Sequence, residues 1–288
     1  MGPSATPFLK WAGGKSGLLE PLLQCLPKSF KAYYEPFLGG GALFFKLASM
    51  GALSRAIISD SNRDLINCYV TVRDRPEELI EQLESLQQRA NDRLFYESFA
   101  RRRFNEIKLK TGLEGDVEKA SLLIYLNKTC YNGLYRVNSR SEFNVPWGRY
   151  RSPRLFDPEN LREVSKVLNT PCIEIKCCDY AEAVEGAVSG DLVYFDPPYQ
   201  PLSRTSSFTS YTSGSFGEVD QRRLASVFGE LSMRSCFVVL SNSYNPLIEE
   251  LYARSIREGK FRKVFAPRQI SCKGKGRSSV AEYIIMSY

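Results

Sequence analysis

The sequence predicts an α/β protein organised around a doubly wound, Rossmann-like sheet. Residues 191–195 and 236–240 contain unbroken apolar runs, as expected of parallel strands covered on both faces. Segments with helical periodicity separate these runs, and strands that alternate with helices are typical of a parallel sheet. The 288 residues suffice for one large domain or two smaller ones, at about 150 residues per domain.

The N-terminal part of the predicted sheet lies between residues 32 and 62. Tyr33 and Tyr34 form a short strand that enters the glycine-rich sequence EPFLGGG at 35–41. A helical run through residues 43–47 follows, and the apolar run at 56–60 ends on Asp60. Glycines let the backbone approach a ligand closely, and an acid at the end of the next strand is where ribose hydroxyls are held. Each feature alone is a common structural one, but together they indicate an adenosine-type ligand.

The middle of the chain has a different character. Residues 75–125 show helical periodicity with polar faces, and Asn132-Gly133 is a strong turn signal. Residues 143–150 fit a returning arm. We therefore expect 69–155 to form an inserted subdomain, mostly helical with a β-hairpin or long loop. Residues 1–68 and 156–288 then form the main domain.

Basic residues exceed acidic ones by 39 to 32, which gives a formal net charge of +7. Residues 100–154 hold 12 Lys or Arg and five Asp or Glu, so this segment carries an excess of the same size. Its basic residues alternate with Tyr, Asn and Trp, which fits groove and phosphate contacts with a nucleic acid. The run at 101–103 also fits a solvated helix face.

Several classes of site are excluded by composition. The sequence contains no histidine, which removes Ser/His and Cys/His nucleophile pairs and His-ligated zinc. The eight cysteines form no CxxC pair and resemble the reduced, buried thiols of cytosolic proteins. Cys172, Cys177 and Cys178 lack a fourth ligand nearby, so no metal site is expected. No stretch is suited to span a bilayer, and we expect a soluble, cytoplasmic protein.

The tetrapeptide DPPY at 196–199 directly follows the apolar strand that ends at Phe195. Ligands of open α/β sheets bind at the carboxyl ends of strands. The prolines hold the loop extended and lack N–H groups, so the Asp196 carboxylate and the Pro197 carbonyl present two acceptors. Two acceptors suit an exocyclic amino group, and Tyr199 can stack on a planar base. The same residues also fit a proline-rich turn whose acid caps the next helix.

Taken together, five ordered motifs resemble the Dam family of S-adenosylmethionine-dependent DNA adenine-N6 methyltransferases. They are residues 10–15, 35–41, Asp60, 127–150 and 196–199. The resemblance extends nearly end to end and includes residues 201–211 and 268–271. It implies a class I methyltransferase sheet, S-adenosyl-L-methionine as cofactor, and 69–155 as the target-recognition domain.

The resemblance also implies the site residues. The catalytic residues would be Asp196, Pro197 and Tyr199. The target adenine would be flipped out of the duplex, and its N6 would attack the methyl group of the cofactor directly. The cofactor would be bound by Trp11, Lys15, Glu35, Phe37, Gly39, Asp60, Asp179, Tyr180 and Asp196. Asp60 would hold the ribose, and Asp179 would accept a hydrogen bond from the adenine amino group of the cofactor.

DNA contacts are implied for Lys10, Tyr131, Asn132, Leu134, Arg136, Asn138, Pro146 and Arg149. Arg136 fits the bidentate reader of a guanine, and Leu134 and Pro146 fit contacts to a thymine methyl. The implied target is GATC. Tyr135, Val137 and Trp147 depart from the family pattern, so the finer contacts are not carried over.

The expected partner is double-stranded DNA, with no membrane and with a monomer in solution. A restriction endonuclease acting on the same site and a solitary regulatory role both stay open. Rival interpretations are an enzyme acting on cytosine N4 or RNA, and a catalytically silent DNA-binding protein. A nicotinamide or nucleoside-triphosphate enzyme is disfavoured because neither GxGxxG nor GxxxxGK[ST] is present.

Overall fold

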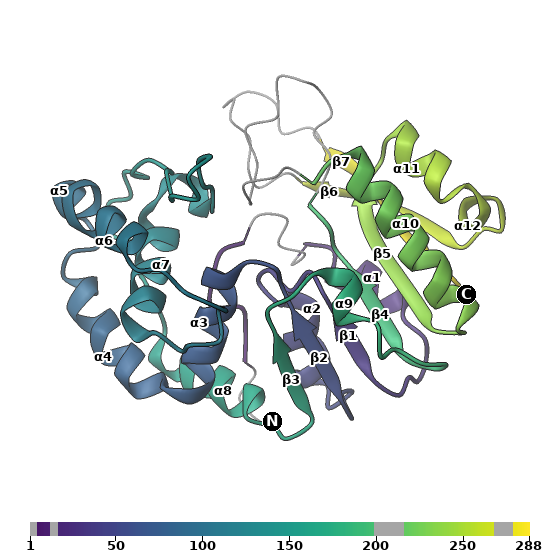
Figure 1. Cartoon of the computed structure of the whole chain (residues 1–288), viewed down its shortest axis with the longest axis horizontal. Helices are drawn as coiled ribbons and strands as arrows, with labels where there is room; N and C mark the ends of the chain where they lie inside the picture. The colour runs from purple at the N-terminus through teal and green to yellow at the C-terminus, as the bar shows by residue number, and fades with distance from the viewer. Residues whose placement is uncertain (1–4, 12–16, 199–215, 268–278) are drawn as a thin grey trace.

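The computed structural model describes residues 5–11, 17–198, 216–267 and 279–288. They form a seven-stranded sheet with the order β3-β2-β1-β4-β5-β7-β6 (Figure 1). The parallel strands are β1 (Tyr33–Glu35), β2 (Ala56–Ser59), β3 (Ile173–Lys176), β4 (Leu192–Phe195) and β5 (Phe237–Ser243). The antiparallel strand β7 (Ser279–Met286) lies between β5 and β6 (Phe261–Pro267).

The four strands predicted from the sequence are confirmed as β1, β2, β4 and β5. Strand β3 escaped the sequence pattern because only one of its four residues is fully buried. The β6–β7 pair was also not predicted. The other strands were found as unbroken apolar runs, which are typical of parallel strands buried on both faces and not of an antiparallel edge. The strand order reverses between β1 and β4, which is where open α/β sheets bind ligands.

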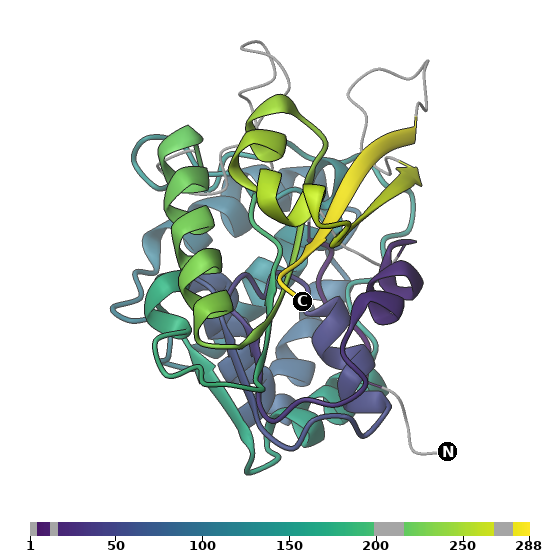
Figure 2. The same ribbon diagram turned by 90° about the vertical axis from the view of Figure 1, so that its right-hand side faces the viewer.

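Helices cover both faces of this sheet. Buried residues of α1 (Leu19–Cys25), α2 (Ala42–Ser49), α3 (Arg63–Asp74) and α8 (Pro158–Leu168) pack with side chains such as Tyr33 and Ile58. The opposite face packs against α9 (Tyr180–Ala183), α10 (Glu218–Met233) and α11 (Pro246–Leu251), with α12 (Ala253–Arg257) alongside. Figure 2 shows α10, α11 and α12 on the side that faces the viewer.

The expected helical segment lies beside the sheet, on the opposite side from α10–α12 (Figure 1). It contains α4 (Pro76–Gln87), α5 (Arg93–Phe95), the π-helix η2 (Tyr96–Ala100), α6 (Arg101–Glu106) and α7 (Val117–Thr129). Helix α3 joins this segment to the sheet, because its buried face packs against both α7 and α8. The predicted domain boundary at 68/69 falls inside α3.

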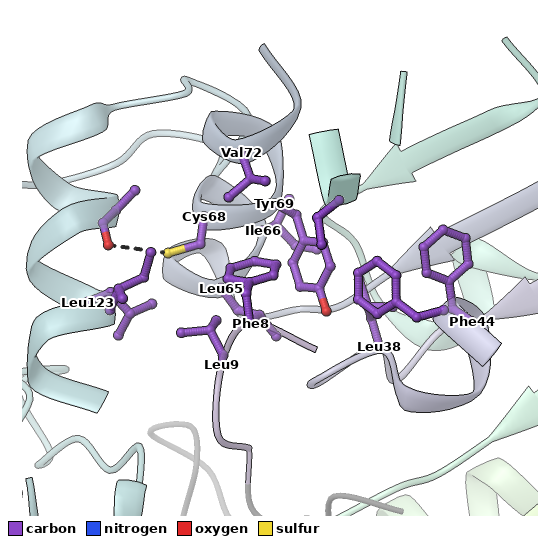
Figure 3. Packing of buried hydrophobic residues seen from close by; sticks show 14 of the residues in the cluster. Phe8, Leu9, Leu38, Phe44, Leu65, Ile66, Cys68, Tyr69, Val72 and Leu123 are labelled. Atoms are coloured by element: carbon purple, nitrogen blue, oxygen red, sulfur yellow. Dashed lines mark hydrogen bonds between the residues drawn. The ribbon is translucent and has the colours of Figure 1, made fainter. Parts of the chain in front are cut away.

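Apolar side chains make this junction continuous. Figure 3 shows Phe8 from the N-terminal segment beside Tyr69 of α3, with ring centroids 5.1 Å apart. Cys68 lies on the α7 side of the same helix and donates a hydrogen bond to the carbonyl of Ala120 at 3.7 Å. The side chains of Phe8, Cys68 and Tyr69 are all buried, so the helical segment and the sheet share one apolar core.

Residues 130–148 form an arm rather than a regular hairpin. Two isolated antiparallel bridges, Cys130–Trp147 and Val137–Phe143, hold its halves together. The Asn132-Gly133 turn is present, as a short 3-10 helix η3 (Tyr131–Gly133), but the arm reverses direction near residues 138–142 instead. Positive φ angles at Asn132 and Ser141 interrupt the extended backbone that continuous strands would need.

Candidate active site

Four carboxyl side chains lie at one edge of the sheet. Glu35 ends β1, Asp60 follows β2, Asp179 lies three residues after β3, and Asp196 follows β4. These strands are parallel neighbours, so their carboxyl ends meet at the same edge. The sequence-predicted acids from four separate strands are therefore brought together at the point where the strand order reverses.

The glycine-rich turn is fixed against the end of β2. The backbone N–H of Gly39 donates to Oδ2 of Asp60 at 3.1 Å, and Asn62 N–H donates to Oδ1 at 2.9 Å. Burial raises the pKa of Asp60 to about 6, although these backbone hydrogen bonds oppose the shift. Gly39 has a φ of +48°, and a Cβ there would lie 2.8 Å from Cδ1 of Trp11. Glycine is thus required both by the backbone conformation and by the neighbouring indole.

Glu35 is only 3% exposed beneath this turn. The hydroxyl of Tyr33 donates to its Oε2 at 2.7 Å. The pKa of Glu35 is raised to about 8, mainly by burial and in smaller part by the nearby Asp196 carboxylate, while hydrogen bonds from Tyr33 and the Phe44 backbone oppose the shift. A buried carboxyl of this kind is suited to a cationic ligand, whose charge would favour ionisation.

Stacked aromatic rings line the neighbouring part of the edge. The rings of Phe37 and Tyr180 are 5.1 Å apart with an interplanar angle of 27°, and Phe216 meets Phe37 edge-on at 5.7 Å. Asp179 caps α9 through the Ala181 N–H and also binds Arg223 at 2.7 and 2.9 Å. Arg223 lies in α10, and Phe216 lies just before that helix begins. No sequence motif indicated either residue.

The described part of the DPPY loop is supported by buried amide side chains of α10 and β5. Pro197 is buried, Asp196 is half-buried, and the Gln221 amide lies 3.5 Å from the Pro198 carbonyl. Gln221 in turn accepts a hydrogen bond from Asn242 at 3.0 Å, and both amides are fully buried. Gln221 and Asn242 are a second set that sequence patterns missed, because buried amides leave no periodic signal. Tyr199 and Lys15 lie outside the described residues.

The N-terminal segment meets the arm at this edge. The amide of Asn127 accepts from Lys10 N–H at 2.9 Å and donates to the carbonyls of Lys10 and Gly133 at 2.6 and 3.0 Å. Trp11 stacks on Tyr135 with ring centroids 5.4 Å apart. Lys10 and Trp11, predicted as DNA and cofactor contacts, are therefore both adjacent to the arm, and Trp11 also packs against Gly39 of the glycine-rich turn.

The remaining predicted DNA contacts lie on the arm or, in the case of Arg149, directly after it. Tyr131, Pro146 and Arg149 are exposed, whereas Asn132 and Leu134 are half-buried. Arg136 donates to the side chain and carbonyl of Asn144 at 2.7 and 3.2 Å. Asn138 is engaged in the turn of the arm, where its Oδ1 accepts from the Arg140 and Glu142 N–H groups.

A family model for D12 class N6 adenine-specific DNA methyltransferases matches residues 11–264. The chain belongs to this family. It is 43% identical to the type II methyltransferase M1.LlaDCHI of Lactococcus lactis subsp. cremoris, over 98% of this chain and 95% of that protein. The type II methyltransferase M.MjaIII of Methanocaldococcus jannaschii is also 43% identical, over 98% and 99%. The DNA adenine methylase of Escherichia coli K12 is 36% identical, over 97% and 94%.

Membership of this family indicates which reaction takes place at this edge of the sheet. The protein is a DNA adenine-N6 methyltransferase, and methyltransferases of this class generally use S-adenosylmethionine. Two carboxyl groups beneath a glycine turn and a stacked aromatic pair suit a ligand with a cationic methionine part and a planar base. No helix among the described residues is both long and apolar enough to cross a membrane.

Proposed function

We propose that this enzyme methylates N6 of an adenine in duplex DNA, within GATC. The observation that carries the proposal is the position of Asp196 and Pro197 at the end of β4, beside the buried Glu35 and within the strand-order reversal. The arm of residues 130–148 adjoins this edge through Trp11 and Tyr135. Residues 69–155 then serve as the target-recognition domain, and 1–68 with 156–288 as the catalytic domain.

The cofactor would lie over the glycine-rich turn. Asp60 would hold its ribose, Glu35, Phe37 and Gly39 its methionine part, and Asp179 and Tyr180 its adenine. Bound there, S-adenosylmethionine supplies an electrophilic methyl group on a sulfonium sulfur. Trp11 and Lys15 would complete the enclosure on the side of the N-terminal segment.

Asp196 and the Pro197 carbonyl would accept hydrogen bonds from the amino group of a flipped adenine. This arrangement turns the N6 lone pair toward the methyl carbon and holds the two reactants in line. The Asp196 carboxylate also stabilises the positive charge that develops on N6. Tyr199 would stack on the flipped base.

Sequence recognition would fall to the arm. Arg136 would read guanine, Leu134 and Pro146 would contact a thymine methyl, and Lys10 would reach the target from the cofactor side. Tyr131, Asn132, Asn138 and Arg149 would make further DNA contacts. The type II names of the two 43% identical relatives favour a partner endonuclease for the same site over a solitary role.

The test is methyl transfer from labelled S-adenosylmethionine to unmethylated plasmid, followed by digestion with nucleases that are sensitive to GATC methylation. We expect protection confined to GATC. Asp196→Asn should lower kcat by about 100-fold or more, because the negative charge that stabilises the positive charge developing on N6 is lost. Asp74→Asn, at the exposed end of α3, is the control and should keep wild-type turnover.

Label incorporation at other sequences would overturn the GATC assignment while keeping the chemistry. Near-native turnover of a folded Asp196→Asn variant would overturn the role of Asp196.

A further inference from the structure

Tyr135 belongs to the arm and contacts the cofactor side of the proposed site through Trp11. Its side chain is only 6% exposed, whereas the adjacent Arg136 is half-buried. The ring stacks on Trp11 at 5.4 Å with an interplanar angle of 27°. On its other side the ring meets Phe143, from the returning half of the arm, edge-on at 5.9 Å. One aromatic ring therefore joins both halves of the arm to Trp11.

The Tyr135 hydroxyl is anchored in α3. It donates to Oδ2 of Asp64 at 2.7 Å, and Asp64 lies in the first turn of α3, four residues after Asp60. Burial and the Asp64 carboxylate raise the pKa of Tyr135 well above its usual value, so the hydroxyl stays protonated and donates. The arm is thus tied to the same strand–helix connection that carries the proposed ribose acid.

A buried cation fixes the Asp64 carboxylate in turn. Lys119 of α7 is 4% exposed, and its Nζ lies 3.5 Å from Oδ1 of Asp64. The same Nζ donates to the carbonyls of Phe104 and Ile107 at 2.6 and 2.9 Å. Because a buried charge is tolerated only when it is paired and hydrogen-bonded, this network allows Asp64 little freedom to move.

Trp11 carries the connection onward to the glycine-rich turn. The indole lies so close to Gly39 that a Cβ at that position would be 2.8 Å from its Cδ1. Gly39 is bonded to Asp60 through its backbone N–H. A shift of Trp11 on ligand binding would therefore move Tyr135 directly. A shift of Asp60 would reach Tyr135 through Gly39 and Trp11.

We propose that Tyr135 is a positioning residue that couples occupancy of the cofactor pocket to the position of the recognition arm. This inference rests on the proposed function, because Trp11 and Asp60 must contact the cofactor and the arm must contact DNA. Coupling of this kind is reciprocal: DNA tightens cofactor binding by the same factor by which cofactor tightens DNA binding.

The experiment measures the dissociation constant of S-adenosylhomocysteine by calorimetry, with and without a short unmethylated duplex. The duplex carries the sequence that the enzyme methylates in plasmid. The coupling factor is the ratio of the two constants. We expect a factor of about 5 or more for the wild type and at least a threefold smaller factor for Tyr135→Phe, which keeps the ring but loses the hydrogen bond to Asp64.

Tyr96→Phe is the matched control. Tyr96 is fully buried, and its hydroxyl donates to the carbonyl of Val145 on the same arm, also at 2.7 Å. Its loss should leave the coupling factor at the wild-type value. Asp64→Asn replaces the charged acceptor of the same Tyr135 hydrogen bond with a neutral amide and should lower the coupling factor in the same direction as Tyr135→Phe. The test therefore does not depend on whether the Tyr135 variant folds well.

An unchanged coupling factor in Tyr135→Phe and Asp64→Asn would overturn the inference. An equal loss in Tyr96→Phe would also overturn it, because the effect would then reflect general loosening of the arm. Wild-type enzyme that binds cofactor and methylates DNA with a coupling factor of one would refute this inference alone. Wild-type protein that binds no cofactor would refute the proposed function, and the inference with it.

Discussion

At the scale of single residues, burial decides the chemistry of the acidic side chains. Glu35 is enclosed beneath the glycine-rich turn, with Tyr33 as donor and the Asp196 carboxylate nearby, and its pKa rises to about 8. Asp60 keeps two backbone donors and its pKa rises only to about 6. The free protein therefore holds a protonated Glu35 at neutral pH, and a cationic ligand would favour its ionised form.

This difference predicts how stability depends on pH. The pKa of Glu35 is raised on folding, from 4.5 to about 8, so its protonated form is favoured by folding. The corresponding stability is present below about pH 4.5 and is lost as the pH rises toward 8. Urea denaturation of the cofactor-free enzyme should give a lower unfolding free energy at pH 8.5 than at pH 6, by up to a few kcal/mol.

Glu35→Gln should remove much of this fall, because the amide does not ionise. Glu81→Gln, on the exposed face of α4, is the control and should fall with pH as the wild type does. An equal fall in Glu35→Gln would contradict the assignment of the pH dependence to Glu35.

At the scale of secondary-structure elements, the turn between β1 and α2 is fixed by contacts from two other parts of the chain. Leu38 N–H donates to the Ser59 carbonyl, Gly39 N–H donates to Asp60, and Trp11 packs on top of Gly39. These three contacts come from β2 and from the N-terminal segment. The turn therefore joins the proposed ribose and methionine subsites into one rigid element.

Gly39→Ala tests this element. The new Cβ would clash with Trp11 in addition to straining a positive φ, so we expect the dissociation constant of S-adenosylhomocysteine to rise about tenfold or more. Gly51→Ala is the matched control, because Gly51 has a φ of +66° and no atom within 4 Å of a Cβ. It should lose about 1 kcal/mol of stability from strain while binding the ligand normally.

Calorimetry measures the binding of both variants, and urea denaturation measures their stability. Normal binding by Gly39→Ala, with a stability loss equal to that of Gly51→Ala, would mean that the Trp11 contact does not shape the pocket.

At the scale of the whole molecule, basic charge is concentrated on the arm and the residues flanking it. Between residues 127 and 153, five cations have no carboxylate partner in the described part of the chain: Lys128, Arg136, Arg140, Arg149 and Arg151. Arg254 of α12 differs, since it pairs with Glu258 at 2.9 Å. Unpaired cations beside the sheet edge suit a polyanion such as the DNA backbone.

The charge distribution predicts the salt dependence of DNA binding. If the four of these cations other than the base-reading Arg136 contact phosphates, the logarithm of the association constant should fall with the logarithm of salt concentration with a slope of about −3.6. Arg149→Ala should make the slope shallower by about 0.9, whereas the control Arg254→Ala should leave it unchanged. Fluorescence anisotropy of a labelled duplex over a salt series measures both. A wild-type slope shallower than about −2 would contradict a phosphate-binding arm.

Local patterns in the sequence by themselves determined the strands β1, β2, β4 and β5, the glycine-rich turn and the acids at the strand ends. Apolar runs report burial on both faces of a sheet, and parallel strands bring their carboxyl ends to one edge. Those two rules placed Asp60 and Asp196 at strand ends, and the family resemblance implied that Glu35 joins them in one site. They did not give the antiparallel β6–β7 edge or the irregular form of the arm.

Only the tertiary structure decided how these pieces are held. The hydrogen bond between Tyr135 and Asp64 joins residues 71 positions apart, and that between Asn127 and Lys10 joins residues 117 apart. The Arg223–Asp179 pair joins α10 to the cap of α9 across 44 positions. Such contacts leave no periodic pattern, because they depend on which helices pack together. The same packing excludes water from Glu35, and that exclusion sets its pKa.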